Sequence, residues 1–170
     1  MEFAKIVLLS VVAAVCYGIA HDQVTARICV EYFSVFHPPV FPTASPTLLA
    51  LGWGVIATWW LGAFLGVVLA ISARFGARRR ITARDLVRPV LRLLAVMALS
   101  AILFGTTGYV LARRGLIAPP RWVTERLDRG SYNAFMADWW AHNASYAAAT
   151  LGGVLLCVIT YRKRIDGNVG

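Results

Sequence analysis

The chain has 170 residues, of which 59% are hydrophobic, against ~45–50% in a typical soluble domain. This composition, with a mean hydropathy of +0.66, excludes an ordinary soluble enzyme and predicts one integral membrane domain over residues 1–170. The net charge of +9 comes from 17 Lys and Arg against 8 Asp and Glu. Because these cations flank apolar runs, they predict contact with the lipid bilayer and not binding of nucleic acid.

Four apolar runs predict four membrane-spanning helices, because each approaches the ~20 residues that cross a bilayer core. The predicted spans are about 3–20, 47–73, 90–112 and 142–161. The first run could instead be a secretory signal cleaved after Ala20, but its length favours a retained helix. Ser45 and Pro46, just before the second run, are a typical helix start.

Small residues recur every four positions along three of the runs, which lets neighbouring helices approach closely in lipid. They are Ser10, Ala14 and Gly18 in the first run, Ala50, Gly54, Thr58, Gly62, Gly66 and Ala70 in the second, and Ala141, Ser145, Ala149, Gly153 and Cys157 in the last. We expect these ridges to pack the helices into one bundle. They also offer a surface for a homo-oligomer or a hetero-oligomer.

The third helix is predicted to begin near Ala83, because Thr82 and Asp85 have the spacing of a capping box. Residues 119–129 are charged and amphipathic, and predict a short helix lying in the membrane interface. The last helix is predicted over residues 132–161, longer than the ~30 Å hydrocarbon core requires. The predicted fold class is therefore an all-α membrane protein, a four-transmembrane-helix bundle with an interfacial helix between helices three and four.

With four spans, both termini and the basic loop 74–88 lie on one side of the membrane. That side carries the larger share of the lysines and arginines, so the positive-inside rule places both termini in the cytoplasm. The loop after helix one and the loop before helix four then share the outer face. All three histidines of the chain are expected at that surface.

The residues with metal-binding or acid–base chemistry also gather there. They are His21, Asp22, Glu31 and His37 in the first loop, and Asp138 and His142 at the head of the last helix. Asp138 and His142 are four apart and share a helix face, where a carboxylate and an imidazole can bind Zn²⁺, Mn²⁺ or Fe²⁺. We therefore predict metal ligands at His21, His142 and Asp138, with Glu31 and Asp22 as catalytic acid–base groups.

Helix geometry limits what the first loop can contribute. A helix from His21 to Glu31 would separate these residues by ~15 Å, too far to share one ion. Either the segment turns between them, or only one of its ends belongs to a site. His37, which precedes two prolines, is more typical of a turn residue than of a ligand.

Three classes of function fit these residues. The leading hypothesis is a membrane-embedded metal-dependent enzyme or metal-binding protein, with hydrolysis of a membrane-delivered substrate as the simplest reaction. The second is haem binding, with His21 and His142 as axial ligands. The third is a non-catalytic scaffold or subunit of a larger complex. Asp138 and His142 could also form an ordinary helix pair, and Arg27 and Glu31 a structural salt bridge.

What the predicted spans lack also bears on function. They contain no acidic residue, which disfavours a proton relay or a transporter formed by one chain.

The run HDQVTARICVEYF from His21 to Phe33, followed by His37, Pro38 and Pro39, resembles a segment of small bacterial integral-membrane proteins with no established activity. The resemblance covers this segment alone. It implies a multi-pass protein of the bacterial inner (plasma) membrane, and it implies no mechanism. The composition, rich in arginine, alanine and glycine, is compatible with that location.

Overall fold

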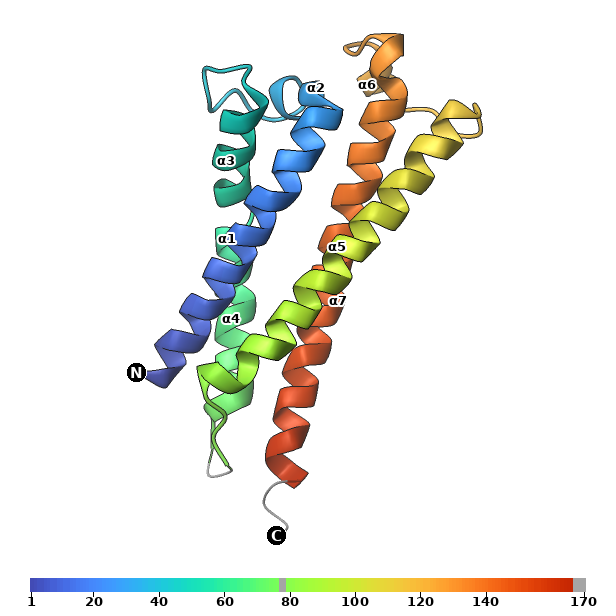
Figure 1. Ribbon diagram of the computed structural model, residues 1–170. Coiled ribbons are helices and arrows are strands. Elements are labelled where there is room, and N and C mark those ends of the chain that lie inside the picture. The colour runs from blue at the N-terminus through green and yellow to red at the C-terminus, as the bar shows by residue number, and fades with distance from the viewer. Residues whose placement is uncertain (77–78, 167–170) are drawn as a thin grey trace.

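The computed structural model describes residues 1–76 and 79–166. All regular structure in these residues is helical, and four of their helical segments are long and apolar enough to cross a membrane. These segments are Glu2–Ile28, Pro46–Arg74, Ala83–Arg113 and Arg129–Arg164. They form one bundle, with the start of the first and the end of the last at the same end (Figure 1). The prediction of an all-α protein with four membrane-length helices is confirmed.

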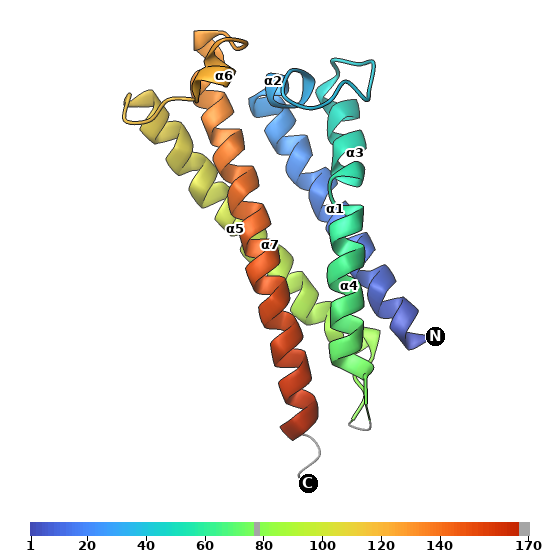
Figure 2. The same cartoon turned by 180° about the vertical axis from the view of Figure 1, so that it is seen from behind.

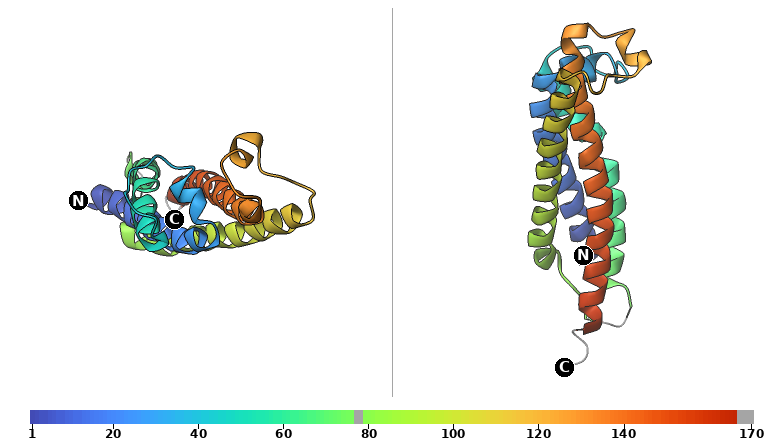
Figure 3. Two further views of the ribbon diagram at one scale, coloured as in Figure 1. Left: turned by 90° about the horizontal axis from the view of Figure 1, so that it is seen from above. Right: turned by 90° about the vertical axis from the view of Figure 1, so that its right-hand side faces the viewer.

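Short breaks divide these segments and their connections further. The elements are α1 (Glu2–Ile28), α2 (Val30–Ser34), α3 (Pro46–Ile56), α4 (Trp59–Arg74), α5 (Ala83–Arg113), α6 (Arg121–Thr124), the 3₁₀ turn η1 (Arg129–Ser131) and α7 (Tyr132–Asp166). α2 and α6 lie at the end of the bundle away from the termini (Figures 2 and 3). We call this the α2 end, and the opposite one the terminus end.

The first helix is longer than the apolar run that predicts it. α1 continues through His21 and Asp22 to Ile28, and ends where Cys29 adopts an extended backbone with φ −144°. These polar residues stay helical because the segment packs into the bundle, with Asp22 and Thr25 buried. His21 and Asp22 therefore lie in a helix, and the prediction of a loop directly after the apolar run is wrong.

The second predicted span is broken near its middle. α3 ends at Ile56 and α4 begins at Trp59. Between them, the Thr58 hydroxyl donates to the carbonyl of Gly54, a side-chain bond that competes with regular helical bonding. α3 and α4 still follow one another along the bundle and together make one membrane-length segment.

Small residues hold α1 against α3 and α4. A Cβ atom added at Gly54 would lie 2.6 Å from the backbone nitrogen of Ile19, and one at Gly62 would lie 2.8 Å from the Cβ of Ala14. The helices approach this closely only because these side chains are absent. The ridge predicted on the second span thus packs within the chain, and an oligomer would need another surface.

α5 and α7 pack together in a similar way. A Cβ atom added at Gly108 would lie 2.7 Å from the carbonyl oxygen of Met136. α5 begins at the predicted capping box, where the backbone N–H of Thr82 donates to the Asp85 carboxylate at 3.0 Å. The predicted start of the third helix at Ala83 is confirmed.

The predicted interfacial helix over residues 119–129 is not continuous. Within this segment α6 is one turn long, and the separate turn η1 follows it. Val123 and Leu127 are buried in a cluster with Phe135 of α7. Packing of these side chains onto α7, and not helical periodicity, therefore holds the segment in place.

A buried arginine closes the terminus end. Arg164 of α7 is 1% exposed, and its guanidinium donates to the backbone carbonyls of Ser72, Phe75 and Arg79 at 2.7–2.8 Å. The first two carbonyls lie at the C-terminal end of α4, where the helix dipole favours a cation. One side chain thus ties the end of α7 to the loop between α4 and α5.

Gly54→Ala tests the close approach of α1 and α3. The new methyl group would meet backbone atoms of Ile19 that cannot rotate away, so we expect a loss of about 1–3 kcal/mol in the free energy of unfolding. Thermal unfolding in detergent measures it. Gly130→Ala is the control, because none of the described atoms lies within 4 Å of its added Cβ. Equal unfolding temperatures for the two variants would contradict the packing argument.

Arg164→Ala tests the closure of the terminus end. Loss of the guanidinium leaves three carbonyls without their donor, which should cost on the order of 2–3 kcal/mol. Lys163→Ala, at the exposed neighbouring position of α7, should unfold like the wild type. A variant at Arg164 as stable as the one at Lys163 would show that the three bonds do not stabilise the bundle.

Candidate metal centre

Two long helices bring three donor side chains together near the α2 end. His21 and Asp22 occupy adjacent positions of α1, and His142 lies in the third turn of α7. One donor atom from each of these residues lies within 4.8 Å of the others. Asp22 and His142 are both buried, and His21 is half-buried. The site therefore joins the first and last long helices of the bundle.

A hydrogen bond of one His142 nitrogen fixes the role of the other. Nδ1 lies 2.8 Å from the backbone carbonyl oxygen of Asp138, and a carbonyl only accepts, so Nδ1 carries a proton. Nε2 lies 3.4 Å from Oδ1 of Asp22. In the neutral ring, Nε2 directs a lone pair at a carboxylate oxygen. The contact therefore needs a proton or a metal cation between the two atoms.

His21 places a second imidazole nitrogen in the group. Its Nε2 is buried and finds no hydrogen-bond partner in the part of the chain that the structure describes. The His21 ring meets the ring of His142 edge to face, with centroids 4.5 Å apart, and stacks on Tyr17. Since a buried polar atom without a partner is costly, a metal ion at this position would stabilise the arrangement.

The spacing of the donor atoms suits a small ion. In a tetrahedral zinc site with bonds of ~2.0–2.1 Å, ligand atoms lie about 3.3–3.4 Å apart. His142 Nε2 and Asp22 Oδ1 already have this separation, 3.4 Å, and the other pairs are separated by at most 4.8 Å. Small side-chain rotations would therefore complete a three-ligand site.

The short helix α2 covers the donor group. The chain turns at Cys29, whose extended backbone ends α1 and begins α2. The Tyr32 ring stacks on His142 with centroids 4.5 Å apart, and Phe33 lies across the same ring. These aromatic rings orient His142 and exclude water from it. Burial raises the pKa of the Cys29 thiol to about 12, so this residue is no thiolate ligand near neutral pH.

His37, the third histidine, packs nearby but outside the donor group. Its Nδ1 donates to the Tyr32 carbonyl at 2.7 Å, and its ring contacts Trp53 with centroids 4.6 Å apart. Burial lowers the pKa of His37 below its usual value. His37 therefore anchors the loop after α2, in the turn role that its position before two prolines predicts.

Asp138, predicted as a ligand, does not join the donor group through its carboxylate. Its backbone oxygen accepts the bond from His142 Nδ1, and its carboxylate is not among the three grouped donors. The carboxylate is fully buried, and neither of its oxygens has a hydrogen-bond partner among the described residues. The four-residue spacing thus correctly predicts that Asp138 and His142 are in contact. The contact uses the backbone carbonyl of Asp138, whereas the prediction was that its carboxylate binds the metal.

Glu31 lies beyond the end of α1, apart from His21. It accepts a hydrogen bond from the Ser131 hydroxyl at 3.4 Å and contacts the Cys29 thiol at 3.5 Å. Of the first polar segment, only the end at His21 and Asp22 contributes to the donor group, one of the two outcomes that helix geometry allows. Asp22, predicted as an acid–base group, lies among the three side chains that could hold an ion.

A cavity of about 110 Å³ extends from the donor group into the bundle. Tyr17 and Ser145 line it beside the histidines, with their hydroxyl oxygens 2.8 Å apart. The rest of its wall is mainly apolar and reaches Cys157 towards the terminus end. Neither Tyr17 nor Ser145 is predicted as a site residue from the sequence. Their signal was their position one helical turn from His21 and His142, respectively.

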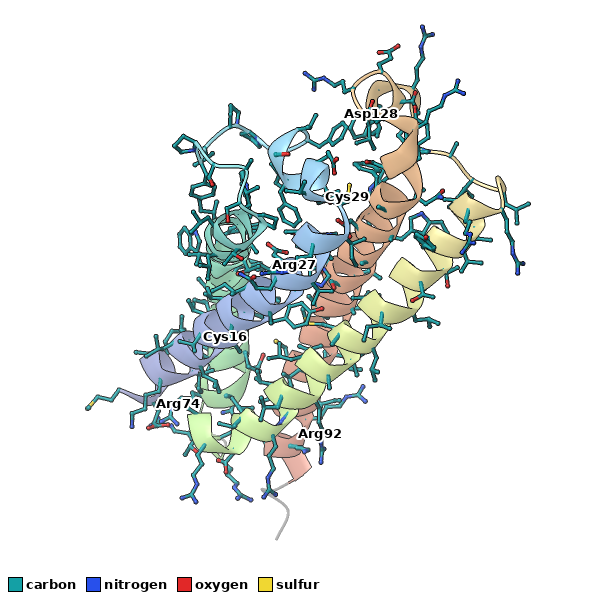
Figure 4. All side chains as sticks on the ribbon, turned by 45° about the horizontal axis from the view of Figure 1, so that its top comes forward. Cys16, Arg27, Cys29, Arg74, Arg92 and Asp128 are labelled. Atoms are coloured by element: carbon teal, nitrogen blue, oxygen red, sulfur yellow. The ribbon has the colours of Figure 1, made fainter. Side chains whose placement is uncertain are left out.

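Labelled charged residues mark the two ends of the bundle (Figure 4). Arg74 and Arg92 lie toward the terminus end, and Arg27 and Asp128 lie toward the α2 end. Arg27 donates to the Thr47 hydroxyl at 2.8 Å. Among the described residues, Arg27 forms no ion pair with Glu31, although their spacing allows one. Asp22 lies about 8 Å from Arg27 along the axis of α1, on the side of the terminus end. α1 is long enough to cross a membrane and contains the buried Asp22, whereas the predicted spans contain no acidic residue.

No protein-family model, curated protein or solved structure matches this chain. The function is therefore argued from the geometry of the donor group and its surroundings.

The lowered pKa of His37 predicts a pH dependence of stability. Because the unfolded chain takes up the proton more readily, the stability from neutral His37 is present above about pH 6.5 and is lost as the pH falls through the folded pKa. The unfolding temperature of the wild type should thus fall more between pH 7.5 and 5.5 than that of His37→Gln. Identical slopes for the two proteins would contradict the buried, neutral His37.

Proposed function

We propose that this protein binds one divalent transition-metal ion through His21, Asp22 and His142, and acts as a membrane-embedded metal-dependent hydrolase. The arrangement at His142 carries the proposal. Its Nδ1 is held by a backbone carbonyl, so its Nε2 lone pair faces the Asp22 carboxylate at 3.4 Å. A cation between these two atoms satisfies both of them. The unpartnered Nε2 of His21 supplies the third ligand.

The ligand set indicates which ions to expect. Two imidazole nitrogens and one carboxylate oxygen suit Zn²⁺, Mn²⁺ and Fe²⁺. Three protein ligands leave a coordination position open, as in catalytic zinc sites, whereas structural sites are closed by four. The ion would supply the Lewis acidity that ionises water near neutral pH. Hydrolysis is therefore the simplest reaction for such a centre.

The residues around the donor group support catalysis without joining the metal. The Asp138 carbonyl orients His142, as hydrogen-bond partners of metal-bound histidines commonly do. Tyr17 and Ser145 present hydroxyl groups to the cavity, where they can bind a polar group of the substrate. Tyr32 stacks over His142 and limits access of bulk water.

We place the protein in the bacterial inner membrane with both termini in the cytoplasm. The excess of lysine and arginine on the side of the termini supports this orientation. The donor group then lies near the outer face, inside helices of membrane length. A substrate delivered by the bilayer is favoured because the exposed surface of these helices is apolar.

A small ion is favoured over haem. The ring centroids of His21 and His142 are 4.5 Å apart, and two rings in direct contact leave no space for a macrocycle between them. A non-catalytic scaffold is also less well supported, because the ridges of α1, α3 and α4 are already packed against one another.

Elemental analysis of the purified full-length protein tests the metal site. We expect about one zinc, manganese or iron per chain, and a loss of at least ~10-fold in His142→Gln, which removes a ligand. His37→Gln is the matched control, because His37 is a nearby histidine outside the donor group.

The two variants distinguish metal bound at the donor group from metal bound elsewhere on the protein. Metal that is retained in His37→Gln and lost in His142→Gln supports the site. Equal loss in both variants, or no metal in the wild type after incubation with these ions, would show the proposal to be wrong.

A further inference from the structure

A groove on the side of the bundle leads towards the candidate metal centre. α1 and α5 diverge towards the α2 end, and α7 passes behind them (Figure 1). The three helices enclose a groove of about 610 Å³, with His21 and Asp138 among its lining residues. Much of the remaining wall consists of small residues, Ala20, Ala98, Ala101, Gly105, Ala137 and Ala141. These residues give the groove a smooth apolar floor.

The rims of the groove are exposed and apolar. Val24 and Ile28 of α1 are 60% and 46% exposed, and Ile102 of α5 is 67% exposed. All three belong to helices long enough to cross a membrane, so the groove opens towards the hydrocarbon of the bilayer. Its surface matches an alkyl chain.

One polar group in the groove lacks a partner. Asp138 is fully buried, and neither carboxylate oxygen has a hydrogen-bond partner within residues 1–76 and 79–166. Buried polar groups are nearly always hydrogen-bonded. Asp22 and Glu31 lie close enough to interact with it electrostatically, but both are acids. The backbone N–H of Cys29 is also near, but it donates to the Thr25 carbonyl at 3.0 Å. A hydroxyl group from outside the described chain can supply this missing partner, because it can donate to one of the carboxyl oxygens.

We infer that the groove binds an uncharged single-chain lipid, whose alkyl chain lies between α1 and α5 and whose head group donates a hydroxyl hydrogen bond to Asp138. As a lipid-binding site, the groove stands on its own geometry and on the unpartnered Asp138. As a substrate site, it rests on the proposed function.

The acids around Asp138 favour an uncharged head group. Because Glu31 lies nearby and is not part of the donor group, it would repel the negative charge of a phosphate. A monoacylglycerol has hydroxyl donors next to an ester. That ester would lie towards His21, which lines both the groove and the inner cavity. Hydrolysis would add water across the ester, with the hydroxyl going to the acyl carbon and the proton to the glycerol oxygen.

Photolabelling of the full-length protein in lipid nanodiscs tests the groove. The probe is a monoacylglycerol with a diazirine in its acyl chain, and the labelled residues are mapped by mass spectrometry. In the wild type, we expect labels on α1 and α5 along the groove. Ala98→Phe fills the groove and should reduce this labelling by roughly fivefold or more. Ala20→Phe, on the opposite wall, should do the same and serves if Ala98→Phe does not fold.

Ala95→Phe is the matched control. Ala95 is exposed, lies one turn from Ala98 on the same helix, and is not among the described residues that line the groove. It should be labelled like the wild type. Labelling that Ala98→Phe and Ala20→Phe leave unchanged would mean that only surrounding lipid was captured, and would overturn the inference.

Head-group preference is measured with a lysophosphatidate probe that has the same acyl chain. The wild type should be labelled several-fold less by this anion, and equal labelling by the two probes would overturn the inference. Metal content is measured in the same samples. Selective labelling without bound metal would contradict the proposed function alone, and bound metal without selective labelling would contradict this inference alone.

Discussion

The bond from His142 Nδ1 to the backbone carbonyl of Asp138 sets the direction of the His142 ring on which the proposed metal site depends. The bond joins two residues of α7 that are four positions apart, so it fixes the imidazole against this helix. The ring then directs Nε2 across the bundle at Asp22. The side chain of Asp138 is not part of the donor group, and Asp138 lines the groove. This interaction thus accounts for the direction of the free His142 nitrogen in the proposed metal site.

The placement of the donor group follows from how the helices pair. α1 packs mainly on α3 and α4, and α5 packs mainly on α7. Glycine residues allow both close approaches, and the contact between the two sets is looser. The inner cavity and the lateral groove lie at that junction. Metal chemistry and access from the bilayer are thus expected in the same region, where Asp22 of α1 meets His142 of α7.

Much of the fold, but only part of the site, could be predicted from the sequence. Uncharged runs and the capping box located the four long helices, because membrane crossing and helix capping are local properties. The end of α1 was missed, since tertiary packing keeps the polar residues after Ala20 helical. The order of the helices correctly predicted that the three histidines lie near the same end of the bundle. It could not show that Asp22 and His142 face each other, or that Asp138 turns its carboxylate away, because side-chain direction depends on how distant helices pack.

X-ray absorption spectroscopy of the zinc-loaded protein tests the central claim most directly, because it identifies the atoms bound to the ion. We expect only nitrogen and oxygen ligands, with scattering from two imidazole rings in the wild type and from one ring in His142→Gln or in His21→Gln. A zinc ion bound by sulfur, or one whose imidazole scattering is unchanged in both variants, would contradict the assignment of His21, Asp22 and His142 as the metal centre.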